Sequence, residues 1–326
     1  MKTIAVVGAN GLVGEKLTQI LQDKALNSEI RLFGNSSVGK RVAFRHKKVT
    51  VESCDRLLDG NVDYAMFMAT EDVAKEYAPQ LAKRGVICID NSAYFRLKKD
   101  VPLVVPSVNG ELIAGKKLIA NPNCSTIQVV ICVNALKPLK PTKLTAVTYQ
   151  AVSGAGKDGL QDLQSANGYG KLRSFRHPIC DNVIPCIGQL RKDGSTSEER
   201  KLLDESRKIL GLPRLKVNGF CARIPVTTGH GVFVNVQFKE KADVKLVKEL
   251  LLNEPNVLVM DDAENGIYPM PSVIRNTKYV GVGRIYKDPS SNGINMFTAA
   301  DNLLRGASYN AYEILERAAK EEGAEL

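Results

Sequence analysis

A cysteine occupies position 124 in the segment Asn-Pro-Asn-Cys-Ser-Thr-Ile, where an apolar strand-like run ends and a helix-like run begins. A side chain at a helix start feels the partial positive charge of unpaired backbone N–H groups, which favours the thiolate and lowers the pKa of a thiol. Pro122 rules out an ordinary strand, and Ser125 and Thr126 suit a first helical turn. Cys124 is therefore a candidate nucleophile, and the alternative is a half-buried structural cysteine.

Three further polar residues each follow an apolar strand-like run. Gln150 precedes a flexible turn from Ser153 to Gly156, Arg223 lies in Cys-Ala-Arg-Ile-Pro-Val, and His230 follows in Thr-Thr-Gly-His-Gly. Acyl chemistry on an anionic substrate needs a nucleophile, a general base and a carboxylate clamp, and a cysteine, a histidine and an arginine supply these groups. For His230 the alternative is a surface histidine whose hydrogen bonds are satisfied locally.

A glycine-rich turn is expected to bind a dinucleotide. Gly8, Gly11 and Gly14 directly follow the first expected strand and open the first expected helix. Glycines in this context let the backbone approach a pyrophosphate, whose charge is met by the helix N-terminus. A structural turn without a ligand is the alternative, since a glycine triplet alone is a weak signal.

The loop after the second expected strand favours NADP over NAD. An acidic residue there would accept hydrogen bonds from the ribose 2′-hydroxyl of NAD. This chain instead has Ser36 and Ser37, followed by Lys40 and Arg41. Small hydroxyls and two cations suit a 2′-phosphate, and a solvated basic loop is the alternative.

The elements that must position these residues begin with an alternation of strands and helices. Strands are expected at 3–7, 30–33, 64–69 and 86–90, and helices at 12–22 and 72–83. This βαβ series predicts an α/β domain of Rossmann type, with a parallel sheet covered by helices on both faces.

The pattern of residue types along the chain changes from residue 143 onward. Long β-branched runs at 144–152, 220–226 and 232–238 predict an open mixed sheet in a second, α+β domain that starts near Cys124. The segment 168–207 is polar and irregular until a helix at 198–210. The segment 301–322 predicts one long helix that packs back on the first domain.

Length and composition fit a two-domain globular protein. The chain has 326 residues, of which 44% are hydrophobic and 25% charged. It has no run of about 18 apolar residues, and Met1 and Lys2 lead directly into a strand, so we expect a cytoplasmic protein with no membrane span or signal peptide. Seven cysteines with no Cys-x-x-Cys pair indicate reduced thiols and no zinc ribbon or other metal site.

The formal charge of +10 raises the question of nucleic-acid binding. Lysines and arginines are scattered along the chain, with only short clusters such as 45–48, and no recognition motif or aromatic interleaving accompanies them. We therefore expect no nucleic-acid partner, but a positive field that gathers small anionic ligands.

Taken together, the motifs resemble the aspartate-semialdehyde dehydrogenase family nearly from end to end. The match includes the glycine turn and the Cys124 segment, and it extends through 91–96, 150–156, 182–185, 198–201, 223–230 and 301–303. Several motifs in one order make this resemblance far more specific than the glycine turn alone.

The resemblance implies a role for each candidate residue. Cys124 would be the acyl-thioester nucleophile, His230 the acid/base, and Gln150 a substrate-orienting group. The substrate carboxylate and amino group would be held by Arg223 and Glu198, and phosphate by Arg96 and Lys201. The NADP site would comprise Gly8, Asn10, Gly11, Leu12, Val13, Ser36, Ser37, Ser153, Gly154 and Asn302.

The implied reaction is reduction of aspartyl phosphate to aspartate semialdehyde with release of phosphate, in lysine, methionine and threonine biosynthesis. Residues 1–123, completed by a C-terminal helix within 301–326, would bind NADP. Residues 124–300 would form the catalytic and dimerisation domain of a homodimer or homotetramer. The chain departs from the family at Gly231, where a serine often follows the histidine, and in lacking an arginine beside Ser36 and Ser37.

Three other functions are weighed against this one. N-acetyl-glutamyl-phosphate reductase has similar chemistry, but its cysteine motif resembles Gly-Cys-Tyr-Pro-Thr. A sugar-phosphate dehydrogenase of the glyceraldehyde-phosphate type would carry Cys-Thr-Thr-Asn-Cys, which is missing. A non-catalytic NADP-sensing protein would have little reason to keep Cys124, Gln150, Arg223 and His230 together.

Overall fold

The structure is a computed structural model that describes residues 1–24, 26–165 and 172–326. The chain forms two compact units, Met1–Pro122 with Ala307–Leu326, and Asn123–Gly306. The start of the segment 168–207, predicted to be irregular, lies outside the described residues. From residue 172 to residue 196 the segment contains turns and isolated bridges.

The first unit is built on a seven-stranded sheet in the order β3-β4-β2-β1-β5-β6-β7. Only β3 is antiparallel to its neighbour. The strands are β1 (Lys2–Val7), β2 (Ser28–Phe33), β3 (Arg41–Phe44), β4 (Lys47–Glu52), β5 (Tyr64–Phe67), β6 (Ile87–Asp90) and β7 (Leu118–Ala120). The predicted parallel sheet is confirmed, whereas the β3-β4 hairpin lies in a stretch for which the sequence pattern predicted no strand.

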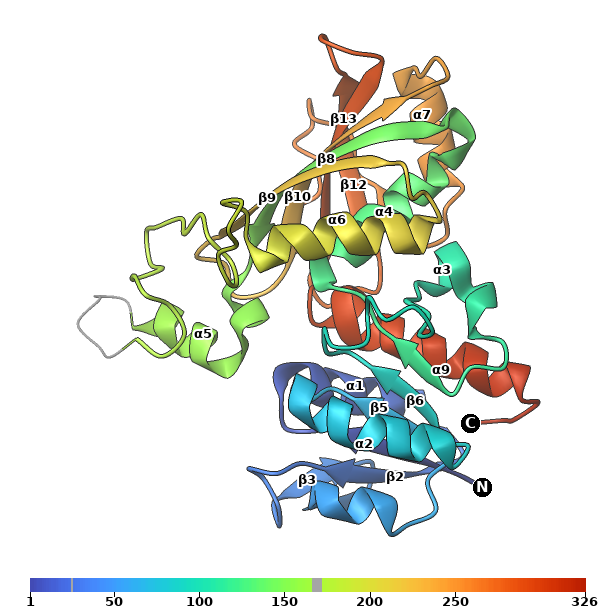
Figure 1. The fold of residues 1–326 in the computed structure, drawn as a ribbon. Helices are drawn as coiled ribbons and strands as arrows, with labels where there is room; N and C mark the ends of the chain where they lie inside the picture. The colour runs from blue at the N-terminus through green and yellow to red at the C-terminus, as the bar shows by residue number, and fades with distance from the viewer. Residues whose placement is uncertain (25, 166–171) are drawn as a thin grey trace. The chain divides into compact units, whose positions relative to one another are not determined.

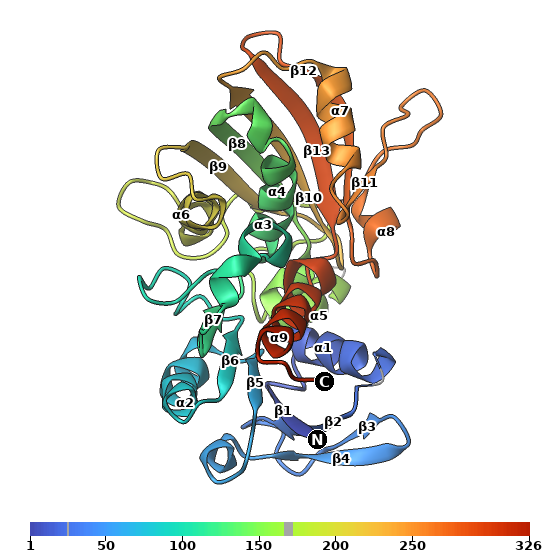
Figure 2. The same cartoon turned by 90° about the vertical axis from the view of Figure 1, so that its right-hand side faces the viewer.

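Helices cover both faces of this sheet. They are α1 (Leu12–Asp23), α2 (Glu71–Lys83), α3 (Pro106–Asn109) and α9 (Tyr309–Glu321), with 3-10 turns η1 (Cys54–Leu58) and η2 (Gly110–Ile113). Figure 2 shows α2 on one side of the sheet and α1 and α9 on the other.

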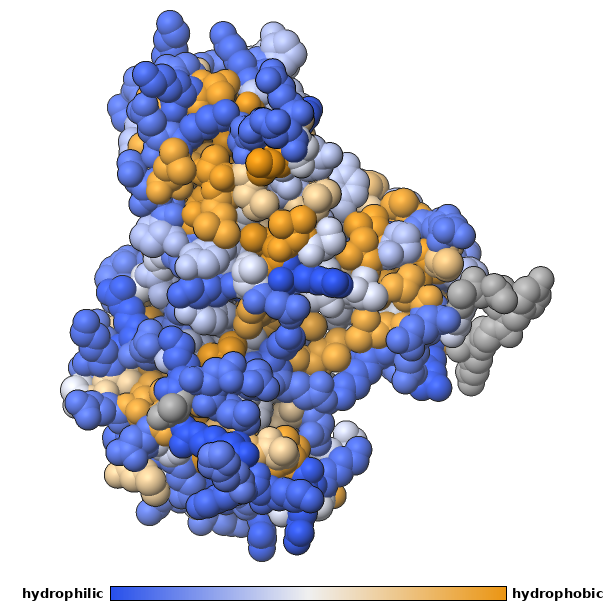
Figure 3. Space-filling model, turned by 180° about the vertical axis from the view of Figure 1, so that it is seen from behind, coloured by the Kyte–Doolittle hydropathy of each residue, from blue (hydrophilic) through white to orange (hydrophobic). Residues whose placement is uncertain are grey.

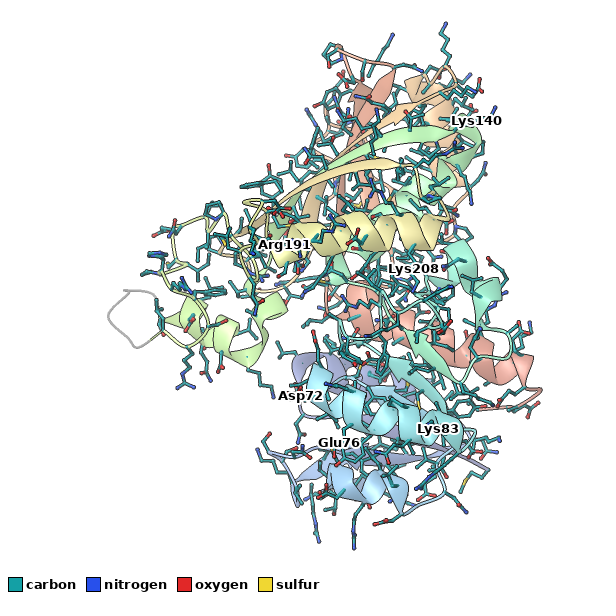
Figure 4. All side chains as sticks on the ribbon, viewed as in Figure 1. Asp72, Glu76, Lys83, Lys140, Arg191 and Lys208 are labelled. Carbon is teal, nitrogen blue, oxygen red and sulfur yellow. The ribbon has the colours of Figure 1, made fainter. Side chains whose placement is uncertain are left out.

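The sequence of α2 explains its orientation. Tyr77 and Leu81 are buried against the sheet, whereas Asp72, Glu76 and Lys83 are exposed and project away from it (Figure 4). Apolar residues three and four positions apart form one face of a helix, so this spacing specifies which side packs.

The second unit is built on a six-stranded mixed sheet in the order β11-β12-β13-β10-β8-β9. Strands β8 and β9 pair in parallel, as do β11 and β12, and the other neighbours are antiparallel. The strands are β8 (Pro141–Gln150), β9 (Lys216–Arg223), β10 (His230–Phe238), β11 (Val257–Val259), β12 (Val280–Lys287) and β13 (Gly293–Ala300). The predicted open mixed sheet is confirmed.

The second unit has five helices in the described residues. They are α4 (Cys124–Ala135), α5 (Gly156–Gln164), α6 (Ser197–Leu210), α7 (Val244–Leu252) and α8 (Pro271–Ile274), with 3-10 turns η3 (Lys137–Leu139) and η4 (Val152–Ala155). Of these, α4, α6 and α7 lie along its sheet, whereas α5 projects beyond the end of the sheet (Figure 1). Every residue of α4 from 125 to 133 is buried, and apart from Ser125, Thr126 and Gln128 these residues are apolar. No helix among the described residues is long and apolar enough to span a membrane.

The single helix predicted over 301–322 is wrong at its start. Residues 304–308 form a π-helical turn, η5 (Leu304–Ser308), and α9 begins only at Tyr309. Asp301 Oδ1 accepts hydrogen bonds from the backbone N–H groups of Leu303 at 2.9 Å and Leu304 at 3.0 Å. Local bonding of this kind competes with regular helix, so Asp301 anchors a turn.

Candidate active site

Cys124 is the first residue of α4, and Asn123 is the N-cap of that helix. Asn123 Oδ1 accepts hydrogen bonds from the backbone N–H groups of Ser125 at 3.0 Å and Thr126 at 3.3 Å. A capping oxygen satisfies N–H groups that the helix itself leaves unpaired. The predicted placement of Cys124 at a helix start is therefore confirmed, and its side chain is half-buried.

Two carboxylates of α6 hold Asn123 in place. The backbone N–H of Asn123 donates to Glu205 Oε2 at 2.7 Å, and its Nδ2 donates to Glu198 Oε1 at 2.8 Å. Glu198 and Glu205 are seven residues apart and so lie on one face of the helix. Since both are buried, α6 fixes the residue that precedes the cysteine.

Glu198 is an ionised carboxylate in a network of donors. Gln150 Nε2 donates to its Oε1 at 3.3 Å, and Lys201 Nζ lies 3.2 Å from its Oε2. Burial alone would raise the pKa of Glu198, but the charge of Lys201 and the hydrogen bonds from Asn123, Gln150 and Lys201 outweigh it and lower the pKa. Three of the predicted site residues, Gln150, Glu198 and Lys201, thus lie together.

His230 faces the cysteine. Its Nε2 lies 3.3 Å from Cys124 Sγ, and its Nδ1 accepts the backbone N–H of Ala151 at 3.0 Å. His230 opens β10 and is fully buried. Burial, and then the positive charge of Arg223, lower the pKa of His230 to about 3, against a smaller opposite influence of Glu198. The pairing of sulfur and imidazole favours a reactive cysteine over a structural one.

Strand register explains why Arg223 joins this group. Arg223 ends β9 directly opposite Gln150, which ends β8. Its Nη1 donates to the carbonyl of Ala151 at 2.7 Å. A Cβ atom at Gly154 would lie 2.7 Å from the same nitrogen, so a larger residue there would displace the guanidinium group of Arg223. Arg223 also lines a pocket of about 690 Å³ whose wall includes Phe175 and Ile187.

Ser153 and Asn302, two of the predicted cofactor residues, contact each other beside this group. Asn302 Nδ2 donates to Ser153 Oγ at 3.0 Å, and Asn302 Oδ1 accepts the backbone N–H of Gly229 at 2.8 Å. Asn302 therefore links the turn after β8 to the residue immediately before His230.

The glycine turn of the first unit has the geometry expected for a dinucleotide. Gly8 has φ +82°, and a Cβ atom there would lie 2.5 Å from the carbonyl oxygen of Met68, the residue after β5. A Cβ atom at Gly14 would lie 2.2 Å from the oxygen of Gly8. Gly11 is the N-cap of α1 and supplies no side-chain cap. The turn therefore passes tightly over the sheet and points the start of α1 outward.

The remaining predicted residues also lie in the first unit. Asn10, Leu12 and Val13 are half-buried in the glycine turn and the start of α1. Ser36 is exposed and Ser37 is buried in the turn after β2. The sixth, Arg96, is buried after β6, where its Nη2 donates to the carbonyl of Asn91 at 2.7 Å.

Comparisons with known proteins agree over nearly the whole chain. Residues 3–116 match the NAD binding domain of semialdehyde dehydrogenases, and residues 135–305 match their dimerisation domain. An aspartate-semialdehyde dehydrogenase of Aquifex aeolicus is 39% identical over 336 residues, which cover 98% of each chain. The chain belongs to the aspartate-semialdehyde dehydrogenase family.

Solved structures of this family share the fold. The aspartate semialdehyde dehydrogenase II of Vibrio cholerae, complexed with ASA, superposes with a TM-score of 0.92 at 34% identity and 98% coverage of both chains. The enzyme of Candida albicans with NADP superposes with a TM-score of 0.79 at 26% identity and 99% coverage of both chains. An aspartate-semialdehyde dehydrogenase fold with a domain for a nicotinamide cofactor is thus established for this chain.

Three residues of the site were not predicted from the sequence. Asn123 could have been found, because an asparagine directly before a helix is a strong N-cap signal. Glu205 could have been suspected from its spacing to Glu198 on one helix. Ala151 gave no signal at all, because it acts through its backbone.

Four other cysteines, Cys54, Cys88, Cys132 and Cys221, are buried. Burial raises the pKa of Cys221 to about 12 and that of Cys54 to about 11. Buried thiols of this kind are poor nucleophiles. Among the residues that the structure describes, no group of three His, Cys, Asp or Glu side chains is placed to hold a metal ion.

Proposed function

We propose that the protein reduces aspartyl 4-phosphate to aspartate 4-semialdehyde through a thioester on Cys124, with release of phosphate. The observation that carries this proposal is the 3.3 Å contact between Cys124 Sγ and His230 Nε2 at a capped helix start. The bound ASA reported for the Vibrio cholerae relative supports the choice of substrate.

Each substrate group has a proposed partner in the chain. Arg223 is buried and borders a pocket, so it suits the substrate carboxylate as a bidentate donor. Glu198 is ionised and can accept hydrogen bonds from the substrate amino group. Gln150 is proposed to orient the acyl group, and Arg96 and Lys201 to bind phosphate.

The cofactor is proposed to be NADP. Gly8, Asn10, Gly11, Leu12 and Val13 would hold the pyrophosphate on the first unit, and within the described residues the buried Asn10 Nδ2 has no hydrogen-bond partner. The 2′-phosphate would be recognised by Ser36 and Ser37, with Lys40 and Arg41 exposed nearby in sequence. Ser153, Gly154 and Asn302 would contact the nicotinamide half.

The side chains of Cys124 and His230 carry the steps that do not involve the cofactor. Cys124 displaces phosphate from the acyl group and forms the thioester, while His230 Nε2 forms hydrogen bonds at the reacting atoms. When bound, the nicotinamide supplies the hydride that reduces the thioester. We accordingly assign cofactor binding to the first unit, completed by α9, and catalysis and dimerisation to the second.

We further propose a homodimer, alone or within a homotetramer, formed through the uncovered face of the second sheet. Tyr149, Phe220 and Tyr286 on this face are 40%, 46% and 45% exposed, and Figure 3 shows hydrophobic residues gathered over it. Phe297 lies beside Tyr149, with 6.2 Å between ring centroids. An apolar patch of this kind marks an interface. Light scattering after size-exclusion chromatography measures the oligomeric state.

The enzyme is proposed to act in the cytoplasm in the biosynthesis of lysine, with its diaminopimelate branch, and of methionine and threonine. All seven cysteines are free thiols, which suits a reducing compartment.

The decisive experiment measures NADPH oxidation with aspartyl phosphate in the wild type, Cys124→Ala and Cys124→Ser. We expect turnover in the wild type only, because a hydroxyl is a far poorer nucleophile than a thiolate near neutral pH. NADPH binding, measured by fluorescence titration, should be unchanged in both variants. N-acetyl-glutamyl phosphate serves as the control substrate. Substantial turnover by either variant would contradict the thioester.

A further inference from the structure

Gly306 packs directly against the candidate nucleophile. A Cβ atom at Gly306 would lie 3.1 Å from Cys124 Cβ, 3.1 Å from the Cys124 carbonyl oxygen and 3.3 Å from Cys124 Cα. Carbon atoms in ordinary contact are about 3.5 to 4.0 Å apart, so a methyl group at this position would be too close to the cysteine. Gly306 is buried, and both residues belong to the second unit.

Space is the reason for a glycine at this position. The φ of Gly306 is not positive, and the residue lies inside the helical turn η5, so its backbone conformation does not require glycine. Alanine is more favourable than glycine in the interior of a helix. Local conformation therefore favours a side chain at 306, and the three nearest atoms that would oppose one all belong to Cys124.

The turn that carries Gly306 is anchored at its start. Gly306 N–H donates to the carbonyl of Asp301 at 2.9 Å, a π-helical bond that spans five residues instead of four. Asp301 is fully buried, and its carboxylate accepts three backbone N–H groups, those of Leu303, Leu304 and Asn276. Single π-helical turns are frequent at functional sites. Here the anchored turn fixes the place where Gly306 meets the cysteine.

The same segment also reaches the imidazole side of the site. Asn302 Oδ1 accepts the backbone N–H of Gly229 at 2.8 Å, and Gly229 directly precedes His230. The segment 301–306 thus touches Cys124 at one end and the residue before His230 at the other. It is placed to set the separation of 3.3 Å between Cys124 Sγ and His230 Nε2.

We infer that Gly306 is a positioning residue for the reaction at Cys124. The bare backbone of the anchored turn η5 forms the surface that holds the cysteine at its distance from His230. The inference rests on the proposed function for the role of Cys124 as the nucleophile, and it assigns no chemical step to Gly306. Because a misplacement of about 1 Å at a reacting group can cost about 10²-fold in rate, a shift of a few tenths of an ångström should be measurable.

The first test adds one methyl group, in Gly306→Ala. We expect kcat for NADPH oxidation with aspartyl phosphate to fall about tenfold or more. The alkylation of Cys124 by iodoacetamide is followed in parallel over a range of pH by peptide mass spectrometry. Its midpoint should move to higher pH by about 0.5 unit or more, because a displaced thiolate is less stabilised by its neighbours. The exposed Cys186 is an internal reference whose alkylation should not change.

Gly281→Ala is the matched control. A Cβ atom at Gly281 would lie 3.1 Å from Pro269 Cβ, 3.3 Å from Ile274 Cδ1 and 3.4 Å from Met260 Sδ. The added methyl group is thus about as crowded as at Gly306, but its neighbours are not residues of the candidate site. This variant should keep the kcat and the Cys124 alkylation profile of the wild type. Equal effects of the two substitutions on Cys124, whether none or a loss, would overturn the inference.

Asp301→Asn tests the same inference without adding an atom to the contact. The amide oxygen can still accept the N–H groups of Leu303 and Leu304, but the amide NH₂ would face the N–H of Asn276, so the anchor of the turn is weakened. We expect the midpoint of Cys124 alkylation to move in the same direction as in Gly306→Ala, by a smaller amount. Circular dichroism shows whether each variant folds. If Gly306→Ala does not fold, an unchanged Cys124 profile in Asp301→Asn overturns the inference.

The outcomes also separate this inference from the proposed function. Alkylation of Cys124 needs no substrate. If it changes in Gly306→Ala but the wild type does not oxidise NADPH with aspartyl phosphate, the positioning by Gly306 stands and the proposed substrate is wrong. If the wild type turns over and Gly306→Ala matches it in both kcat and alkylation, the proposed function stands and the role of Gly306 is refuted.

Discussion

Replacing Asn123 measures how far the residue before the cysteine supports the site. Asn123→Ala removes the cap of α4, worth about 0.5 to 2 kcal/mol. It also removes the donor that lies 2.8 Å from Glu198 Oε1, and a hydrogen bond to a charged group contributes about 1.5 to 3 kcal/mol. Adding the two ranges gives a loss of about 2 to 5 kcal/mol in the free energy of unfolding.

Asn123→Ser is the matched control. The serine hydroxyl can cap α4 but cannot reach Glu198 as an amide does, so this variant should recover about 1 kcal/mol relative to alanine. Urea unfolding gives the free energies directly, and each kcal/mol should lower Tm by about 2 to 4 °C in a domain of this size. The pH dependence of Cys124 alkylation by iodoacetamide reports the thiolate in the same samples.

The reasoning would be refuted by an alanine variant within 1 kcal/mol of the wild type and with an unchanged alkylation profile. If serine were as destabilising as alanine, the cap would contribute nothing, and the link to Glu198 would account for the whole effect.

Three further predictions concern other parts of the chain. Ser37→Asp should weaken NADP more than NAD, because a carboxylate repels a 2′-phosphate, and equal losses in calorimetric titrations would show that this loop does not bind that phosphate. Arg223→Lys should lower kcat/KM for the amino-acid substrate, whereas Arg96→Ala should mainly raise KM for phosphate in the reverse direction; the opposite pattern would exchange their roles. Burial would raise the pKa of Asp162, but the backbone N–H groups of 173–175 lower it. The ionised Asp162 therefore contributes to stability above about pH 4, and this contribution is lost as pH falls. The difference in unfolding free energy between wild type and Asp162→Ala should shrink in acid. A difference that stays constant with pH would contradict this prediction.

Strong periodic patterns predicted most of the fold. The apolar runs of β1 and β5, the amphipathic α2 and the β-branched β10 lie where the sequence placed them. Continuous apolar runs are typical of strands buried on both faces, and helical spacing of apolar residues is typical of a helix that packs on one side. The β3-β4 hairpin was missed because each strand has only two alternating apolar residues, Val42 and Phe44 in β3 and Val49 and Val51 in β4, and the exposed basic stretch 45–48 separates them. The start of α9 was missed because Asp301 prefers local backbone hydrogen bonds to helix, a competition that a pattern of apolar residues does not contain.

The candidate site was predictable where side-chain chemistry carries the signal. Cys124, Arg223 and His230 were found because each reactive type stands beside a strand-like run. In the structure Cys124 begins α4, Arg223 ends β9 and His230 opens β10, and β9 and β10 both pair with β8. Their mutual distances depend on the register of β8 and β9 and on the peptide group of Ala151. Strand register and backbone hydrogen bonds join segments that are far apart in the sequence. The type of a single residue therefore does not predict them.

The bonding of Ala151 also constrains any redesign of substrate length. Its carbonyl holds Arg223 and its N–H holds His230, so one peptide segment sets the spacing between the proposed carboxylate clamp and the sulfur. A variant meant to accept an acid one carbon longer would have to draw Arg223 away from Cys124, and this movement would pull on the residue that holds the imidazole. Engineering a longer substrate into this scaffold therefore calls for a new cation elsewhere on the pocket wall, with Arg223 retained for its bond to the Ala151 carbonyl.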